Sequence, residues 1–332
     1  MKLNKVEILT LLKESKDYIS GQELCERYHA SRTAIWKLIR QLKEEGYQID
    51  AVQNKGYRLI GCPDVLSAGA IKSGLTTKKM GQELHYHPVI GSTNTEAKRL
   101  GEEGAPEGTL VAADQQTGGK GRRGRVWQSP SGCGIYFTIL LRPQMNPSDA
   151  SMITLVIAYS VVRAIRQYLG TCVGIKWPND IVWEGKKIAG ILTEMTLEAD
   201  YISYVVVGVG INVNNESFEA YPEEVRERAT SLQIACGHPV SRAELLQKIC
   251  ECFEEDYEAF VRAGDLEPFA EMYNTMMVNY KRVVRVLDPK GEFEGTARGI
   301  NRRGELLVET ADGNITEVYA GEVSVRGVYG YV

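Results

Sequence analysis

The sequence lacks a CxxC pair, a signal peptide and a bilayer-length apolar run. Its seven cysteines are odd in number and scattered over 332 residues, so neither a disulfide framework nor a zinc site is expected. The most apolar runs, "MITLVIAYSVV" and "YVVVGVGINV", are too short to span a membrane and predict core elements. His85 and His87 have no third ligand nearby, so we expect no metal site. From the short apolar runs we expect no membrane association, and from the scattered cysteines a cytoplasmic location.

An excess of positive charge is also missing. The net charge is -4 from 39 Lys+Arg and 43 Asp+Glu, which excludes a protein that coats nucleic acid by charge alone. Residues 1–62, however, carry eleven basic and eight acidic side chains, a net +3 that leaves about -7 for the rest. With the Gly and Pro punctuation at 61–67 and the short β-type runs after 274, this predicts three domains: 1–62, 63–273 and 274–332.

The first segment has the pattern of two closely spaced helices followed by a hairpin. Ser20 and Glu23 form a capping box, a turn follows at His29, and Ser31 caps a second helix whose outer face is cationic and hydrogen-bonding. A hairpin with the turn "QNKG" then predicts a winged helix-turn-helix, in which the second helix enters the DNA major groove. The alternative is a helical protein-interaction domain. The expected DNA-binding residues are Ser31, Arg32, Thr33, Trp36, Lys37, Arg40 and Lys55.

The segment "GGKGRRGRVW" (118–127) concentrates four glycines and four cationic residues in eight positions. Three of its glycines match G-x-G-x-x-G, but strands are predicted on both sides, so the dinucleotide-binding context is wrong and no Walker loop is present. Glycines permit close backbone approach, and guanidinium groups bind phosphate oxygens with two hydrogen bonds. This predicts a phosphate-binding loop, with a mobile charged surface loop as the alternative.

Four further stretches surround this loop in the chain. "KWPND" and "KKIAGIL" flank a hairpin with the turn "WEGK", where Asp180 can orient an amine and Lys187 can neutralise a carboxylate or phosphate; solvated charges are the alternative. "VVVGVGINVN" predicts a buried strand ending at Asn212, whose glycines 208 and 210 allow close approach. "GSTNTEAKRL" predicts a helix start, with Thr93 and Glu96 as a capping box.

The order "STN", "GKGRRGR", "KWPND", "KKIAGIL" and "GVGINV", behind a winged helix and ahead of a small β module, resembles the biotin protein ligases. It is most similar to the bifunctional kind that also represses the biotin operon. The resemblance covers nearly the whole chain and implies an α+β fold: a winged helix, a central mixed sheet with helices, and a small C-terminal SH3-like β-barrel. One departure is Lys120, where the family's loop commonly has arginine.

The resemblance implies a two-step reaction. Biotin and ATP, accompanied by Mg²⁺, form biotinyl-adenylate, and biotin then passes to a lysine of a biotin carboxyl carrier protein of the acetyl-CoA or pyruvate carboxylase type. Arg122, Lys187 and Asp180 are the implied catalytic residues. The implied binding residues are Ser92, Thr93, Asn94, Gln115, Lys120, Gly121, Arg122, Trp127, Lys187 and Asn212.

The resemblance also implies operator DNA as a partner and a homodimer that biotinyl-adenylate favours, paired through the strand at 190–196. A repressor that senses its ligand without transferring it, and a lipoate-type ligase, are the alternatives. Pyrophosphate release and competition between acyl substrates distinguish them.

Overall fold

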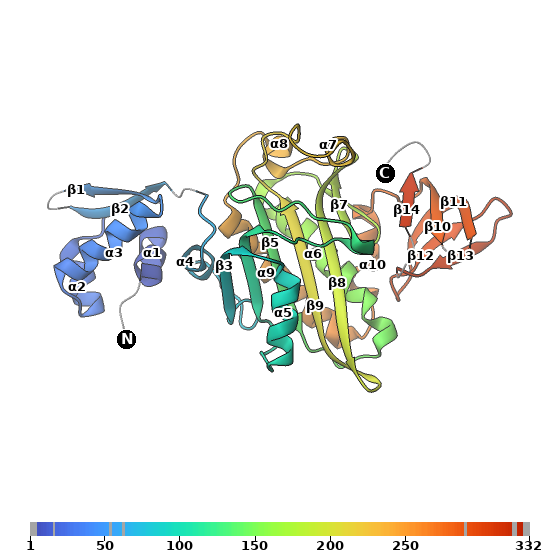
Figure 1. The fold of residues 1–332 in the computed structure, drawn as a ribbon, viewed down its shortest axis with the longest axis horizontal. Coiled ribbons are helices and arrows are strands. Elements are labelled where there is room, and N and C mark those ends of the chain that lie inside the picture. The colour runs from blue at the N-terminus through green and yellow to red at the C-terminus, as the bar shows by residue number, and fades with distance from the viewer. Residues whose placement is uncertain are drawn as a thin grey trace.

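Three bodies follow one another along the long axis of the molecule (Figure 1). The computed structural model describes residues 5–15, 17–52, 55–61, 64–288, 291–320 and 324–327. Helices with a hairpin lie at one end, a seven-stranded sheet with helices lies in the middle, and a five-stranded sheet lies at the other end. The predicted α+β class is confirmed.

The N-terminal body has the predicted winged helix-turn-helix arrangement. The Ser20 hydroxyl accepts a hydrogen bond from the Glu23 amide at 3.0 Å, and Ser31 accepts one from Ala34 at 3.2 Å. His29 makes the turn in the left-handed conformation, with φ 49°. Of the predicted hairpin turn, Gln53 and Asn54 lie outside the described residues. The elements are α1 (Lys5–Glu14), α2 (Gly21–Tyr28), α3 (Arg32–Glu44), β1 (Gln48–Val52) and β2 (Gly56–Gly61).

The central sheet has the order β3-β4-β5-β9-β8-β7-β6 and is mixed, since β3 and β4 are parallel and the other pairs are antiparallel. Its strands are β3 (Leu84–Ile90), β4 (Leu110–Gln116), β5 (Gly134–Leu141), β6 (Gly174–Lys176), β7 (Asp180–Trp183), β8 (Lys186–Glu198) and β9 (Tyr201–Asn212). The helices of this body are α4 (Ala68–Lys72), α5 (Thr93–Glu102), α6 (Ser151–Leu169), α7 (Glu223–Arg226), α8 (Leu232–Cys236), α9 (Arg242–Ala263) and α10 (Glu267–Met276).

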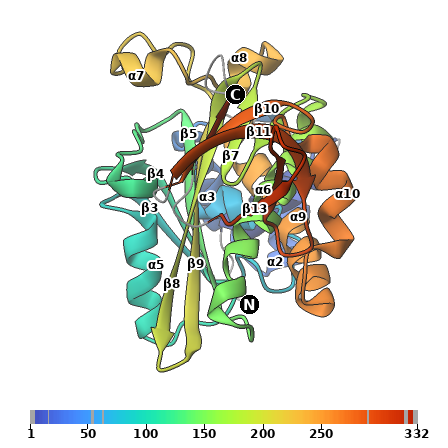
Figure 2. The same cartoon turned by 90° about the vertical axis from the view of Figure 1, so that its right-hand side faces the viewer.

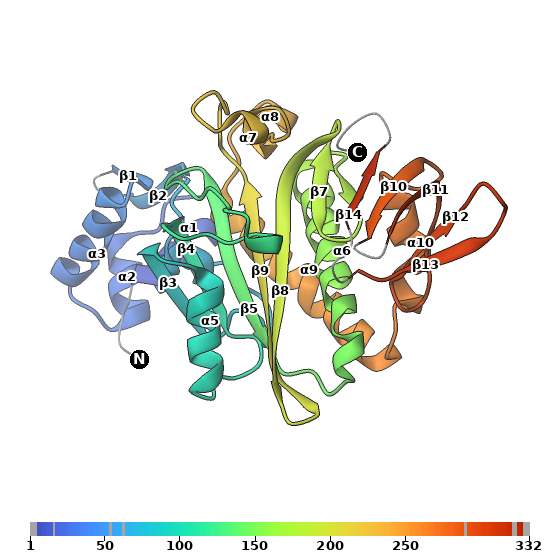
Figure 3. The same ribbon diagram turned by 45° about the vertical axis from the view of Figure 1, so that its right-hand side comes forward.

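The two faces of this sheet are covered by different helices (Figure 3). Alternate residues of a strand point to opposite faces. Val111 and Val206 therefore pack in one apolar cluster with Leu100 of α5, while their neighbours Ala112 and Val207 belong to the larger core beside α6 and α9. Helix α5 lies on one side of β8 and β9, with α6 and α9 on the other (Figure 2).

The longest apolar segment departs in part from the expectation drawn from the sequence. The expected absence of a bilayer-length apolar run is wrong, because the segment 147–169 is long and apolar enough to cross a membrane. The prediction that "MITLVIAYSVV" forms a core element is confirmed, because 67% of the most apolar window of this segment is buried inside the protein. Within α9 the acidic run 251–260 buries Phe253, Tyr257 and Phe260, so only part of it faces solvent.

The C-terminal body is one antiparallel sheet in the order β13-β12-β11-β10-β14. The Trp177 indole donates to the Gly304 carbonyl at 3.1 Å and ties this sheet to the central body. Among the described residues no pairing joins β13 to β14, so closure into a barrel stays a prediction. The strands are β10 (Val283–Asp288), β11 (Gly291–Ile300), β12 (Leu306–Glu309), β13 (Ile315–Val318) and β14 (Ser324–Gly327).

Candidate functional site

The segment 118–127, which we call the Gly/Arg loop, joins two adjacent strands, as predicted. β4 and β5 are antiparallel neighbours, and the loop folds back over their ends through backbone hydrogen bonds from Gln116 to Ser129 (3.1 Å) and from Trp127 to Gly119 (3.0 Å). A single 3₁₀ turn, Arg122–Gly124, lies at its tip, with Arg123 at φ 56°. The loop does not open a helix of the Rossmann kind, so its glycines serve another purpose.

The four cations of the loop fall into two groups. Arg122 is partly buried; it donates to Asn179 Oδ1 at 2.8 Å and to the carbonyl of Ala320, in the C-terminal body, at 3.2 Å. Lys120, Arg123 and Arg125 are exposed. The charged-surface alternative therefore does not suit Arg122, and the other three side chains, although exposed, line the cavities described below.

Lys187 and Asp180 form a close pair on the β7–β8 hairpin. Lys187 Nζ lies 2.6 Å from Asp180 Oδ1, with the side chains only 25% and 15% exposed, and 5.3 Å from the centre of the Trp127 ring. A cation over an aromatic ring and beside a carboxylate is held in one place. The solvated-charge alternative is therefore wrong for both residues.

Glycines beneath the loop make room for its tryptophan. A Cβ atom on Gly210 would lie 2.4 Å from Trp127 Nε1, and one on Gly190 would lie 3.2 Å from the same ring. A Cβ on Gly208 would lie 2.0 Å from Asn94 Oδ1. The close approach predicted at 208 and 210 is therefore made by the protein's own side chains, which form the wall of a cavity.

A small polar cavity of about 50 Å³ lies between the start of α5 and the loop. Ser92, Thr93 and Asn94 line it together with Gln116, whose Oε1 accepts from the Thr93 amide at 2.8 Å. Gln115 is not among the lining residues, because neighbouring residues of β4 point to opposite faces and the prediction was one position early.

The predicted capping box at this helix start is wrong. Ser92, not Thr93, is the N-cap, and its side chain makes no capping hydrogen bond. The Thr93 hydroxyl lies 2.8 Å from that of Thr138, and Glu96 pairs with Arg99. The side chains at the start of α5 therefore face the cavity instead of the helix end.

A larger cavity of about 400 Å³ adjoins the small one. It contains Asn212, aromatic side chains Phe218 and Tyr221, and three cations that the sequence did not single out: Lys176, Arg228 and Arg326. Arg326 comes from β14 and Arg122 reaches the same body, so the C-terminal sheet completes the cavity. Both cavities share one wall, formed by Gly121, Arg122, Trp127, Asn179 and Lys187.

Lys176 is the most perturbed of these cations. It is 5% exposed, and burial lowers the pKa of its ammonium group to about 8, although the Asp180 carboxylate opposes that shift. Lys176 is the first residue of the "KWPND" stretch. The sequence indicated a site at this stretch but did not indicate that Lys176 is buried there.

Nothing in the described ranges resembles a resident metal centre, because no three His, Cys, Asp or Glu side chains gather in one place there. Asp180 and Glu224 are the carboxylates lining the larger cavity. Mg²⁺ commonly binds proteins through one or two carboxylates and the phosphates of its nucleotide. The cavity therefore fits a magnesium ion that arrives with a nucleotide.

The predicted DNA-binding side chains form a separate surface on the N-terminal body. All of them are exposed, and Trp36, at 54%, carries the Arg40 guanidinium 5.6 Å from its ring centre. Their role in DNA binding stays a prediction. The residues of this surface, which we call the α3 face, are Ser31, Arg32, Thr33, Trp36, Lys37, Arg40 and Lys55.

Family models match all three bodies. Residues 5–58 match an HTH domain, residues 86–212 the biotin/lipoate A/B protein ligase family, and residues 282–326 the biotin protein ligase C-terminal domain. Among solved structures, the biotin protein ligase of Aquifex aeolicus in complex with biotin and ATP superposes with a TM-score of 0.64. It is 33% identical and covers 74% of this chain and 99% of its own.

Similar proteins extend over nearly the whole chain. The bifunctional ligase/repressor BirA of Bacillus subtilis is 42% identical over 93% of this chain and 94% of its own length. The bifunctional ligase/repressor BirA of Escherichia coli is 33% identical over 98% and 99%. With a matching winged helix, ligase body and C-terminal module, the chain belongs to the bifunctional ligase/repressors of the biotin protein ligase family.

Proposed function

We propose that the two joined cavities bind biotin and ATP and form biotinyl-adenylate across their shared wall. The observation that carries this proposal is that Arg122 and Lys187 lie on the wall between a small polar cavity and a large cationic one. The ureido head of biotin has N–H donors and a carbonyl acceptor, which suit Thr93, Asn94 and Gln116. Its carboxylate then meets the α-phosphate of ATP at the shared wall.

Three side chains of the wall act in the first step. A biotin carboxylate oxygen attacks the α-phosphorus, and pyrophosphate leaves as the bond to the β-phosphate oxygen breaks. Lys187 and Arg122 offset the repulsion between the two anions and stabilise the charge that grows on the phosphate oxygens. Trp127 closes the apolar side, and Mg²⁺ enters as the MgATP substrate.

In the second step a lysine amine of the carrier attacks the carbonyl of the adenylate, an amide bond forms, and AMP leaves. Asp180 is placed to orient that amine, because its carboxylate lines the larger cavity. Its pairing with Lys187 at 2.6 Å holds the carboxylate in place at the site. The carrier is a biotin carboxyl carrier protein of the acetyl-CoA or pyruvate carboxylase type.

The part of β8 beyond Gly190 is the proposed surface for a homodimer and for carrier docking. β7 pairs with β8 only from Lys186 to Gly190. After Gly190, β9 is the only described strand that pairs with β8. The exposed side chains of Met195 and Leu197 follow on this strand. An open strand edge can accept another strand, so a second copy and the carrier compete for it. Biotinyl-adenylate, by ordering the loop, favours the dimer.

The α3 face binds operator DNA in that dimer. One winged helix offers few phosphate contacts, whereas two copies can occupy two related half-sites. The same chain thereby links repression of biotin genes to the amount of adenylate that no carrier has used.

The test is a purified reaction with biotin, ATP and a carrier domain, followed by pyrophosphate release and by the mass of the carrier. Biotin is expected to give one pyrophosphate per biotin transferred, and lipoate is expected to give none. A carrier that gains lipoate, or adenylate that forms without transfer, would instead support one of the two alternatives.

A further inference from the structure

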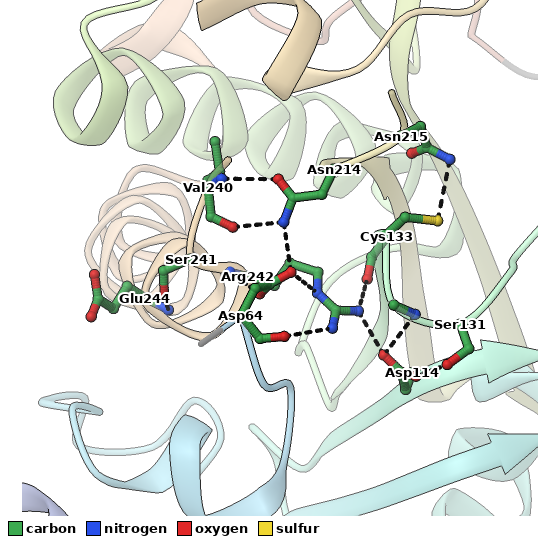
Figure 4. A network of polar contacts seen from close by, with 12 residues as sticks. Asp64, Asp114, Ser131, Cys133, Asn214, Asn215, Val240, Ser241, Arg242 and Glu244 are labelled. Carbon is green, nitrogen blue, oxygen red and sulfur yellow. Dashed lines mark hydrogen bonds and ion pairs between the residues drawn. The ribbon is translucent and has the colours of Figure 1, made fainter. Parts of the chain in front are cut away.

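A buried guanidinium joins three parts of the chain beside the active-site loop (Figure 4). Arg242 is the first residue of α9 and its side chain is 3% exposed. Its Nε lies 2.6 Å from Asp64 Oδ2 and its Nη1 lies 2.6 Å from Asp114 Oδ1. Removing one partner of such a buried charge leaves the others poorly compensated. A change at any one of the three side chains therefore alters the balance of charge around the other two.

Asp114 fixes the end of the loop that leads into β5. Its carboxylate accepts hydrogen bonds from the Ser131 hydroxyl and from the Gly132 amide at 3.2 Å. Burial opposes ionisation, yet the Ser131 hydroxyl and the Arg242 guanidinium hold the pKa of this carboxyl below its usual range. Arg242 Nη1 also donates to the carbonyl of Gly134, the first residue of β5, at 3.1 Å. One guanidinium thus bridges the strands on both sides of the loop.

Asp64 belongs to the junction that follows the winged helix. It accepts from the Arg242 backbone amide at 2.9 Å and from Asn214 Nδ2 at 2.6 Å. Asn214 follows Asn212, which lines the larger cavity, by two residues. The junction is therefore held by the same guanidinium that holds the loop.

The winged helix itself rests on this region. The hydroxyl of Thr10, in α1, lies 3.1 Å from the carbonyl of Ser73, which caps α4. Gln247 of α9 donates to the Ala70 and Ile71 carbonyls at 2.7 and 2.9 Å. The first turns of α9 therefore contact both α4, on which α1 packs, and the base of the loop.

We propose that Arg242 is a positioning residue that couples the Gly/Arg loop to the winged helix through Asp114 on one side and Asp64 on the other. A shift of the loop base moves Asp114, and the buried guanidinium cannot follow it without changing its hold on Asp64. Coupling of this kind is reciprocal, so a change at the junction must also loosen the loop. The coupling itself is independent of the proposed function; only its effect on DNA binding rests on that function.

Hydrogen exchange on the ligand-free, full-length protein tests the coupling with matched variants. Asp64→Asn is expected to speed exchange of the loop-base amides of Gln116 and Trp127 at least about fivefold, and Asp114→Asn to do the same for Ile71 and Ser73 of the junction. Asp149→Asn is the control, because Asp149 pairs with Arg303 at 3.0 Å and is 22% exposed against 20% for Asp64.

Amides of β9 report any global loss of stability in the same experiment. If exchange changes only on the side that carries the substitution, the proposal is overturned. If Asp114→Asn does not fold, Asp64→Asn decides alone, because in that variant Asp114 remains as a carboxylate partner of the buried Arg242 guanidinium.

A second measurement asks whether the coupling reaches DNA. With biotin and ATP present, Asp64→Asn is expected to retain adenylate formation within about twofold and to lose at least about fivefold of the ligand-dependent gain in operator affinity. The Asp149→Asn control keeps that gain. A full gain in Asp64→Asn would overturn the proposal. If exchange shows the coupling but biotin and ATP leave the operator affinity of the natural protein unchanged, the proposed repressor function fails and the coupling stands.

Discussion

The Gly/Arg loop and the α3 face are both cationic, but the protein holds their charges in different ways. In the loop, Arg122 is partly buried against Asn179 and the carbonyl of Ala320, and Lys187 opposite is paired with Asp180. On α3, by contrast, Lys37 and Arg40 are exposed to solvent.

This difference shows that the burial of a cationic side chain determines what it can do. A cation fixed in a partly buried wall stabilises one developing charge at one place. Exposed cations on a helix instead meet a row of phosphates, each contact being weak and sensitive to salt. We therefore expect single substitutions in the wall to have large effects on chemistry, and those on α3 to have smaller effects on DNA binding.

The largest effect is expected for Lys187→Ala. Loss of the cation on the shared wall should slow adenylate formation about 10²-fold, or about 2.7 kcal/mol of barrier. Single-turnover release of pyrophosphate from biotin and ATP measures it. Lys186→Ala is the matched control, because Lys186 is the exposed neighbour on the same strand. Equal losses at both positions would show a diffuse charge effect and contradict the assignment.

Arg122→Ala should come next. Without its contacts to Asn179 and Ala320, the loop closes less firmly, and biotinyl-adenylate should leave about tenfold faster, about 1.4 kcal/mol. Dissociation of preformed adenylate, chased with unlabelled ligand, gives this rate. Arg262→Ala, which removes an exposed arginine that lines neither cavity, should leave the rate nearly unchanged. A rate equal to that of the unmodified protein in Arg122→Ala would mean that the loop does not retain the adenylate.

A smaller effect is expected from pH at Lys176. Because burial lowers the pKa of Lys176 to about 8, its ammonium is mostly protonated at neutral pH and loses its charge as pH rises through that value. ATP affinity should consequently fall severalfold on going to alkaline pH. Lys176→Arg should keep its affinity across this range, and Lys176→Met should be weak throughout. If Lys176→Met showed the same pH profile of ATP affinity as the natural protein, Lys176 would not be the group that binds ATP.

The sequence predicted the elements of this site better than its individual contacts. Local signals identified the loop between two strands and the β7–β8 hairpin, because turns depend on neighbouring residues. The sequence predicts Gln115, whereas Gln116 faces the cavity, because the face of a strand depends on register set by the whole sheet.

Contacts between distant segments had no local signal. Arg326 and Arg228 line the cavity with Lys176, although the three come from separate parts of the chain. Arg242 joins Asp64 to Asp114 across more than a hundred residues. Only the packed fold brings such groups together, so no spacing in the sequence indicates them.

The smallest effect is expected on the α3 face. Lys37→Ala should weaken operator binding severalfold and reduce the slope of log K against log salt by about 0.9, the value for one phosphate contact. Titration of operator DNA at several salt concentrations measures both. Lys186→Ala, which removes an exposed lysine of the central body, is the matched control and should leave the slope unchanged. An unchanged slope in Lys37→Ala would remove that lysine from the DNA contact.

The account's central claim is that one chain holds a chemical site and a DNA-binding surface whose cations have separate tasks. The most direct measurement determines adenylate formation and operator binding for Lys187→Ala and Lys37→Ala, with preformed biotinyl-adenylate supplied at saturation in the DNA assay. Lys187→Ala is expected to lose adenylate formation and keep operator binding, and Lys37→Ala is expected to show the reverse. Loss of both activities in either variant would contradict the division.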